Sequence, residues 1–114
     1  MSLNIIIREA EGVTVLGLKG KIVLGAECNA LRERVKHLLA SNQKKILLDL
    51  GDVSFIDSAG VGTLVATFTS TRAQGGALKL VNLTKKFQET LQVTRLLTVF
   101  ESFDDQAKAV ASFQ

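Results

Sequence analysis

Short apolar runs alternate with longer segments of helical periodicity along this chain, and that alternation constrains its fold more than any other feature. A strand that is followed by a helix and then by another strand needs a crossover connection, which places the two strands parallel in one sheet. The first two strand-like runs, residues 3–8 and 13–19, are separated by a short segment containing Glu11-Gly12 and predict an antiparallel hairpin. We therefore expect an α/β domain with a mixed sheet and about four flanking helices, in the order β-β-α-β-α-β-α-β-α.

Periodicity and turn signals set the expected bounds of the later elements. Helices are expected over residues 26–41, from Ser58 to Gly75-Gly76, from a Thr84 cap to about Thr94, and after the start signal "SFDD" at 102–105. Strands are expected over residues 45–50, with 53–57 leading out of that strand, and over 77–83 and 96–100.

The same patterns predict which side chains are buried. The 26–41 helix has one apolar stripe, formed by Cys28, Leu31, Val35, Leu38 and Leu39. In the second strand, Val13 and Val15 face one side of the sheet and Leu16 and Leu18 face the other. Because both sides carry apolar residues, this strand should be covered on both faces. The closing helix should turn Ala107, Val110 and Ala111 inward.

Length, charge and cysteine content exclude several classes of protein. The 114 residues fit one domain, residues 1–114. Apolar runs are only a few residues long, whereas a membrane-spanning helix needs about 20, so we expect no membrane insertion. The chain start lacks signal-peptide features and Cys28 is the only cysteine, which favours a cytoplasmic location without disulfides. The net charge of +3 is small and its basic residues are scattered, so no direct nucleic-acid binding is expected.

Few side chains suited to catalysis or metal binding occur in this chain. It has one His and one Cys, no C-x-x-C or H-E-x-x-H motif and no phosphate-binding loop, and "GVG" at 60–62 is too short for a dinucleotide fingerprint. His37 should be solvated on the polar helix face, one turn after Glu33, and Cys28 should act as a small hydrophobe. We expect no cofactor, no metal and no enzyme activity.

The stretch "SFIDSAGVG", residues 54–62, places a single hydroxyl, Ser58, at the start of a helix. A structural interpretation is that Ser58 is the N-cap, because a serine oxygen can accept a backbone N–H from the first helical turn. That role leaves Gly60 and Gly62 unexplained, since each costs about 1 kcal/mol in a helix relative to Ala. It also does not explain why Asp57 stands beside the hydroxyl.

A second interpretation is that Ser58 is phosphorylated. Gly60 and Gly62 would keep side chains away from the helix start, where unpaired N–H groups and a partial positive charge suit a phosphate. The modification would add about −1.5 to −2 charge at neutral pH. Next to Asp57, this charge would release a partner that had docked on the unmodified surface.

A third interpretation is that Ser58 is a nucleophile. Hydrolases place such a serine at a strand-to-helix turn within G-x-S-x-G, but Ile56 stands here where the first glycine belongs. A nucleophilic serine also needs an adjacent base, and His37, the only histidine, precedes it in the chain and is expected to face solvent.

A second face of the Ser58 helix carries only small side chains. Close packing against a neighbouring helix and a flat contact strip for a partner both explain this face. Its members are Ala59, Gly62, Ala66, Thr69 and Ala73.

The segments "DVSFIDSAGVGTLV" and "GGALKLVNLTKKF", together with the order of elements, resemble a STAS domain, and more narrowly a bacterial anti-sigma factor antagonist. The likeness covers essentially the whole chain. It implies that Ser58 is phosphorylated by a serine kinase that is also an anti-sigma factor. The unphosphorylated antagonist binds this kinase and frees the sigma factor, phosphorylation releases the antagonist, and a phosphatase resets Ser58.

The resemblance also implies a set of partner-binding residues. Asp57 belongs to the recognition surface, Gly60 and Gly62 keep the helix start open, and Thr63 lies near the same surface. The full implied set is Asp57, Ser58, Ala59, Gly60, Gly62 and Thr63.

One position departs from the family pattern. Many members carry an acid shortly after the glycine that ends the second strand, as in G-x-L-D, whereas Val23 stands at that position here. This departure leaves room for a divergent partner. The alternative function is that of a similar module in another complex, such as a stressosome-like assembly or a regulatory subunit of a lipid transport system.

Overall fold

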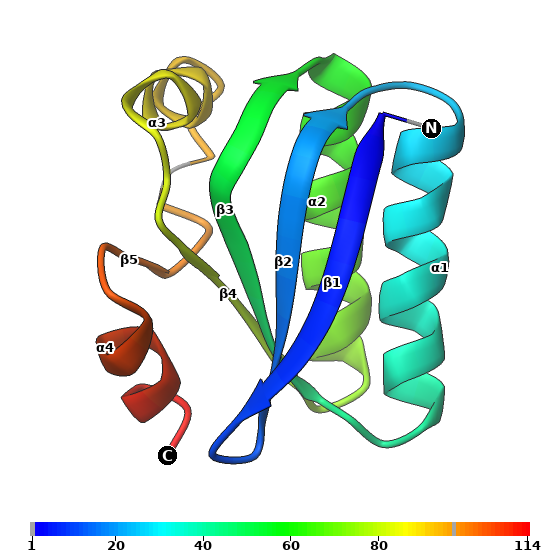
Figure 1. Ribbon diagram of the computed structural model, residues 1–114, viewed down its shortest axis with the longest axis vertical. Helices are drawn as coiled ribbons and strands as arrows, with labels where there is room; N and C mark the ends of the chain where they lie inside the picture. Colours follow the sequence, from blue (N-terminus) through cyan, green and yellow to red (C-terminus); the bar gives the residue numbers. More distant parts are fainter. Residues whose placement is uncertain (1, 97) are drawn as a thin grey trace.

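The protein folds around a five-stranded sheet, seen in a computed structural model that describes residues 2–96 and 98–114 (Figure 1). The strands lie in the order β1-β2-β3-β4-β5, with β1 antiparallel to β2 and the other neighbours parallel. The elements are β1 (Leu3–Ala10), β2 (Val13–Ile22), α1 (Ala26–Ala40), β3 (Lys45–Ile56), α2 (Ser58–Ala73), β4 (Ala77–Val81), α3 (Lys85–Val93), β5 (Ser102–Phe103) and α4 (Gln106–Ala111). The predicted α/β class, mixed sheet and element order are confirmed.

β1 and β2 form the predicted hairpin. Glu11 and Gly12 connect the two strands with φ angles of 51° and 82°. Positive φ at both central residues is the geometry of a type I′ turn, one of the two common two-residue hairpin turns. Pairing then runs without a register shift along the whole of β1. β1 is the end strand of the sheet, and its outer edge has no strand partner among the described residues.

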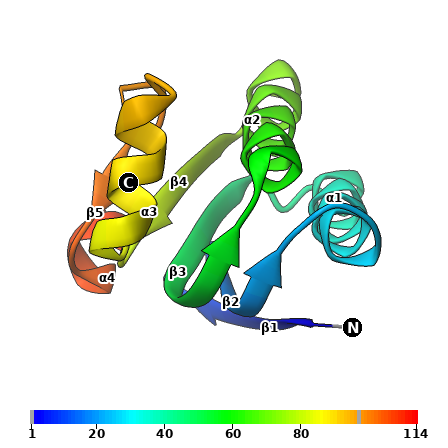
Figure 2. The same ribbon diagram turned by 90° about the horizontal axis from the view of Figure 1, so that it is seen from above.

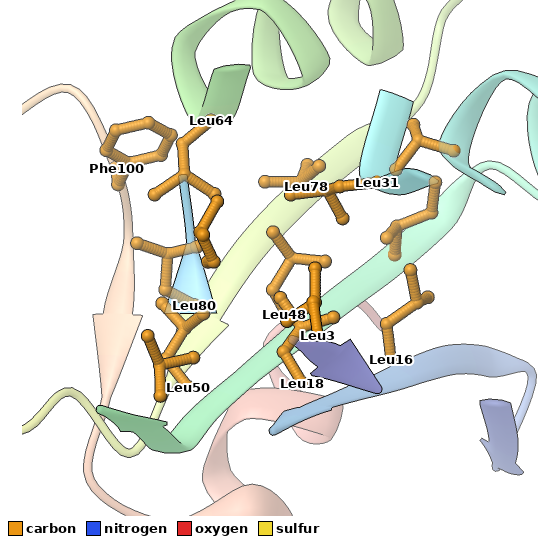
Figure 3. Close-up of a cluster of buried hydrophobic side chains, with 14 of the residues drawn as sticks. Leu3, Leu16, Leu18, Leu31, Leu48, Leu50, Leu64, Leu78, Leu80 and Phe100 are labelled. Atoms are coloured by element: carbon orange, nitrogen blue, oxygen red, sulfur yellow. The ribbon is translucent and has the colours of Figure 1, made fainter. Parts of the chain in front are cut away.

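The helices cover the two faces of the sheet unequally (Figure 2). The larger hydrophobic cluster lies between one face and the helices α1, α2 and α3, and many of its leucines are drawn in Figure 3. Leu16 and Leu18 of β2 belong to this cluster. Val13 and Val15 of the same strand belong to a smaller cluster on the opposite face, under α4. The predicted two-sided burial of β2 is therefore confirmed.

The helices match their predicted spans closely. All five residues of the predicted α1 stripe are buried. α2 ends at Ala73, just before the predicted glycine pair. α3 is capped by Thr84 as predicted, because the Thr84 side chain accepts the Phe87 N–H at 3.2 Å. None of the helices that the structure describes has the length and apolar character needed to cross a membrane.

β3 is longer than predicted. It continues past residue 50 to Ile56, because its parallel pairing with β2 resumes after a register shift beyond Gly17 and ends with Ile22 opposite Ile56. The apolar run ends at Leu50, so the pattern of apolar residues did not reveal this second half of the strand. The extension matters because it brings the ends of β2 and β3 to the same edge of the sheet.

The prediction of a strand over residues 96–100 is wrong. Residues 98–100 lie in turns and a bend, Leu97 is outside the described residues, and the strand is instead β5, which pairs with the end of β4. Phe100 is buried in the larger cluster and Leu96 packs against it, so the burial of these two side chains accounts for part of the apolar run that suggested a strand. β4 also ends earlier than predicted, at Val81.

The start of the last helix was also predicted wrongly. Asp105, rather than Ser102, is the N-cap of α4, and its side chain accepts the Lys108 N–H at 3.1 Å. Because the helix begins later, its buried positions are Ala109 and Val110. The predicted burial of Ala107 and Ala111 is wrong, since both are exposed.

Candidate partner-binding site

Ser58 is the first residue of α2, directly after the end of β3. β2 and β3 are parallel and end side by side, with Ile22 opposite Ile56. The connections that follow these two strands therefore lie at one edge of the sheet, where α1 and α2 both begin (Figure 1). This edge gathers the β2–α1 loop, Asp57 and Ser58.

Asp57, rather than Ser58, is the N-cap of α2. Its backbone is extended, and its Oδ1 accepts the Gly60 N–H at 2.8 Å. The interpretation of Ser58 as the capping residue is therefore wrong. The Ser58 side chain is exposed, and its hydroxyl has no hydrogen-bond partner among the described residues. Since Asp57 provides the cap, the Ser58 hydroxyl is not part of it.

The second oxygen of Asp57 connects α2 to the β2–α1 loop. Its Oδ2 accepts the Leu24 N–H at 3.0 Å, while the Asp57 N–H donates to the carbonyl of Ile22 at 3.3 Å. The hydrogen bonds from Leu24 and from Gly60 hold the pKa of the Asp57 carboxyl below its usual value of 3.8. Hydrogen bonds of this kind favour the charged form of a carboxyl group, so Asp57 is a fixed negative charge beside Ser58.

The two glycines of the site have different roles. A Cβ at Gly60 would lie 2.2 Å from the Ile22 carbonyl oxygen, so Gly60 is needed for the close approach of α2 to the end of β2. The expectation that Gly60 keeps the surface open is wrong, because this residue is buried. Gly62 is exposed, and a Cβ there would meet nothing within 4 Å. Of the two glycines, only Gly62 leaves the surface beside Ser58 flat.

Thr63 does not lie at the exposed surface. It is 0% exposed and its Oγ1 donates to the Ala59 carbonyl at 2.9 Å. The expectation that Thr63 belongs to the partner-binding surface is wrong, because a buried side chain that bonds to its own helix cannot contact a docked protein. Ala59 is half-buried.

The small-residue face of α2 is turned to solvent. Gly62, Ala66, Thr69 and Ala73 are all exposed. The helix packs inward instead with a face that includes Val61, Leu64 and buried threonines. Close packing against a neighbouring helix therefore does not explain the small side chains. The alternative, a contact strip for a partner on this face of α2, stays a prediction.

Two exposed apolar side chains near this edge were missed by the sequence analysis. Leu24 is 77% exposed in the loop that Asp57 holds, and Phe55 is 45% exposed near the end of β3. The Lys86 ammonium of α3 lies 5.8 Å from the centre of the Phe55 ring. The exposure of Leu24 could have been predicted, because this residue lies in the loop between the predicted strand and the next helix and belongs to neither apolar face. The exposure of Phe55 could not, since it depends on how α3 packs.

The geometry does not support a nucleophilic role for Ser58. α1 and α2 begin at the same edge, but His37 lies in the last turn of α1 and is exposed. Eleven residues of helix separate it from Ala26, a rise of roughly 16 Å, so its imidazole cannot reach the Ser58 hydroxyl. Cys28 is buried, as predicted. The described residues also contain no group of three or more His, Cys, Asp or Glu side chains that could hold a metal ion.

Comparisons with known proteins match nearly the whole chain. The family model of the STAS domain matches residues 4–109. The anti-sigma-B factor antagonist of Bacillus subtilis (strain 168) is 31% identical over 89% of this chain and 91% of its own length. A Thermotoga maritima crystal structure, provisionally named an anti-sigma factor antagonist, has a TM-score of 0.88 at 24% identity and covers 96% of this chain and 93% of its own.

The phosphorylated form of the Bacillus cell fate determinant SpoIIAA has the same fold. Its TM-score is 0.75 at 17% identity, and the match covers 97% of this chain and 100% of that one.

Proposed function

This chain belongs to the STAS domain family, and we propose that it is an anti-sigma factor antagonist whose binding to its partner is switched by phosphorylation of Ser58. The proposed partner is an anti-sigma factor that is also a serine kinase. The unmodified protein binds this kinase and so frees a sigma factor in the bacterial cytoplasm. Phosphorylated Ser58 ends the contact, and a phosphatase restores the unmodified state.

The observation that supports this proposal most directly is the exposed hydroxyl of Ser58 beside a cap that another residue provides. A kinase can reach this oxygen, because the side chain is exposed at the start of α2. The hydrogen bond from the Gly60 N–H to Asp57 does not involve the Ser58 side chain. A phosphate at the helix N-terminus is also favoured by the helix dipole, so modification leaves the fold intact.

The proposed switch is electrostatic. A phosphoserine adds about −1.5 to −2 charge at neutral pH, beside the ionised carboxylate of Asp57. The surface around it offers apolar and small side chains to a partner, namely exposed Leu24 and Gly62 and half-buried Ala59. A partner that packs on such a surface would have to bury two adjacent negative groups after modification, and burying unpaired charges is strongly unfavourable.

Binding measurements with charge variants test this proposal. The affinity of the purified kinase should be similar for wild type and Ser58→Ala, and at least about tenfold weaker for Ser58→Asp, or ~1.4 kcal/mol. Ser70→Asp is the matched control, because Ser70 is exposed on the same helix and distant from its start. It should leave the affinity unchanged. The proposal fails if Ser58→Asp binds as tightly as Ser58→Ala, or if the kinase and ATP label another residue.

A further inference from the structure

The outer edge of β1 is an unprotected strand edge. β1 ends the sheet, and no other element lies beyond it in Figure 2. Natural sheets usually protect such edges with proline, with charged side chains, lysine above all, with a β-bulge or by keeping the strand very short. β1 spans eight residues, contains neither proline nor lysine, and pairs with β2 in unbroken register. Its two charged residues, Arg8 and Glu9, stand together near one end.

The backbone groups that point away from β2 can be identified. The Lys21 N–H donates to the Ser2 carbonyl at 2.9 Å, so the pair Ser2–Lys21 is a hydrogen-bonded one. In antiparallel pairs such positions alternate along the strand, so the even-numbered residues of β1 bond to β2. The N–H and C=O groups that face outward therefore belong to Leu3, Ile5, Ile7 and Glu9.

Exposed isoleucines lie along this edge on both faces of the sheet. Ile6 is 62% exposed, and its cross-strand neighbour on β2 is Gly17, which has no side chain to cover it. Ile7 is 39% exposed on the opposite face, the one covered by α1 and α2, where it stands across from Leu16. Ile5 lies on that face as well and is partly buried against the larger cluster.

We propose that β1 is a dimerisation edge, which pairs antiparallel with β1 of a second copy of this chain about a two-fold axis at Ile6. This register sets Ile6 against Ile6 of the second copy, and Ile5 against Ile7 of the second copy. The outward N–H and C=O groups of Ile5 and Ile7 then bond to each other across the axis. Asn4 meets Arg8, so no like charges face each other.

The sequence of β1 is complementary to itself in one antiparallel register, which indicates that the partner at this edge is a second copy of the chain. An axis at Ile7 would set Ile6 against Arg8 and Ile5 against Glu9, and an axis at Ile5 would shorten the overlap of the strands. Only the register centred on Ile6 matches every isoleucine of the strand with another isoleucine. Such a two-fold contact closes on itself, so it produces a dimer rather than an open filament. The contact lies on β1 and does not depend on the proposed role of Ser58.

Sedimentation equilibrium and hydrogen exchange test the dimer. The wild-type mass should rise with concentration from that of one chain towards that of two, and the Ile5 and Ile7 amides should become protected in parallel. Ile6→Lys and Ile6→Glu should each raise the dimer dissociation constant at least about tenfold, because like charges then face each other at the axis. An equimolar mixture of the two variants should recover the dimer, since opposite charges meet there.

A matched control distinguishes this contact from nonspecific hydrophobic association. Val93→Lys changes an apolar side chain of α3 that is 84% exposed, and it should leave the dissociation constant unchanged. Because Ile6 is exposed in the single chain, both Ile6 variants should keep the urea unfolding midpoint of the wild-type monomer. A wild-type chain that stays monomeric, or a dimer that persists in Ile6→Lys, overturns the proposal.

Discussion

The carboxylate of Asp57 and the backbone N–H of Leu24 are joined by a 3.0 Å hydrogen bond, which connects the start of α2 to the loop after β2. The other oxygen of the same carboxylate caps α2 through Gly60. One side chain therefore holds together the two segments that form the candidate site. The position of the exposed Leu24 relative to Ser58 depends on this contact.

Replacing Asp57 should destabilise the protein and release the Leu24 loop. Asp57→Ala removes both acceptors, whereas Asp57→Asn keeps one side-chain oxygen for the Gly60 N–H and loses the second acceptor. The urea midpoint should therefore fall in the order wild type, Asn variant, Ala variant, and the Leu24 amide should exchange faster in both variants. Asp52→Ala, at an exposed position on β3, is the control and should leave the midpoint and the Leu24 amide unchanged. Equal midpoints for wild type and Asp57→Ala would contradict the double role of this carboxylate.

Ser58→Ala should hardly change the stability. The hydroxyl is exposed and Asp57 provides the cap, so the free energy of unfolding should change by less than about 0.5 kcal/mol, as for most surface substitutions. Urea unfolding with linear extrapolation measures this quantity. A loss of about 1 kcal/mol or more is typical of a removed N-cap. Such a loss would show that Ser58 shares the capping role.

Alanine substitutions at the two glycines near the start of α2 should change the free energy of unfolding in opposite directions. At Gly60 the new Cβ would lie 2.2 Å from the Ile22 carbonyl oxygen and 2.6 Å from Ile56 Cγ1. Overpacking of this kind costs roughly 1–3 kcal/mol, and this exceeds the gain in helix propensity. Gly62→Ala meets no neighbour and should increase the free energy of unfolding by up to about 1 kcal/mol. Urea unfolding of both variants tests the difference, and changes of the same sign would disprove it.

Acid should weaken the attachment of the chain start to α1. Hydrogen bonds from the Ser2 hydroxyl and the Ser2 backbone N–H lower the pKa of Glu27 from 4.5 to about 2. Because the folded state favours the ionised carboxylate, this stabilisation is complete above pH 4.5 and is lost as the pH falls towards 2. In Glu27→Gln, the urea midpoint should therefore decrease less than in the wild type as the pH is lowered through that range. Glu33→Gln, on the exposed face of the same helix, should keep the wild-type slope.

Much of the fold follows from local pattern. The apolar stripe of α1, the Thr84 cap and the turn at Glu11-Gly12 each involve residues that are neighbours along the chain, so spacing alone was enough to predict them. Alternation of strands and helices predicted a mixed sheet with a parallel part. The place of Ser58 at the start of a helix was predicted on the same grounds.

The errors concern contacts between distant segments. β5 was misplaced because an apolar run can be buried as a strand or as a loop, and only the packing of Phe100 distinguishes the two. Thr63 was expected near the surface because the family resemblance implied it, and helical spacing does not say which face of α2 is covered. Exposure of Phe55 depends on the position of α3 in the same way.

The sequence by itself determined that a hydroxyl would stand where a strand passes into a helix, flanked by an acid and by small residues. Only the tertiary structure decided what each of these residues does. Asp57 and Ser58 are both good capping residues, and in the folded chain it is Asp57 that has the extended backbone and accepts the Gly60 and Leu24 N–H groups. Gly60 is needed because the end of β2, a segment more than thirty residues earlier, lies against it. Such choices depend on distances between strands that pair across the sheet, and no local pattern contains those distances.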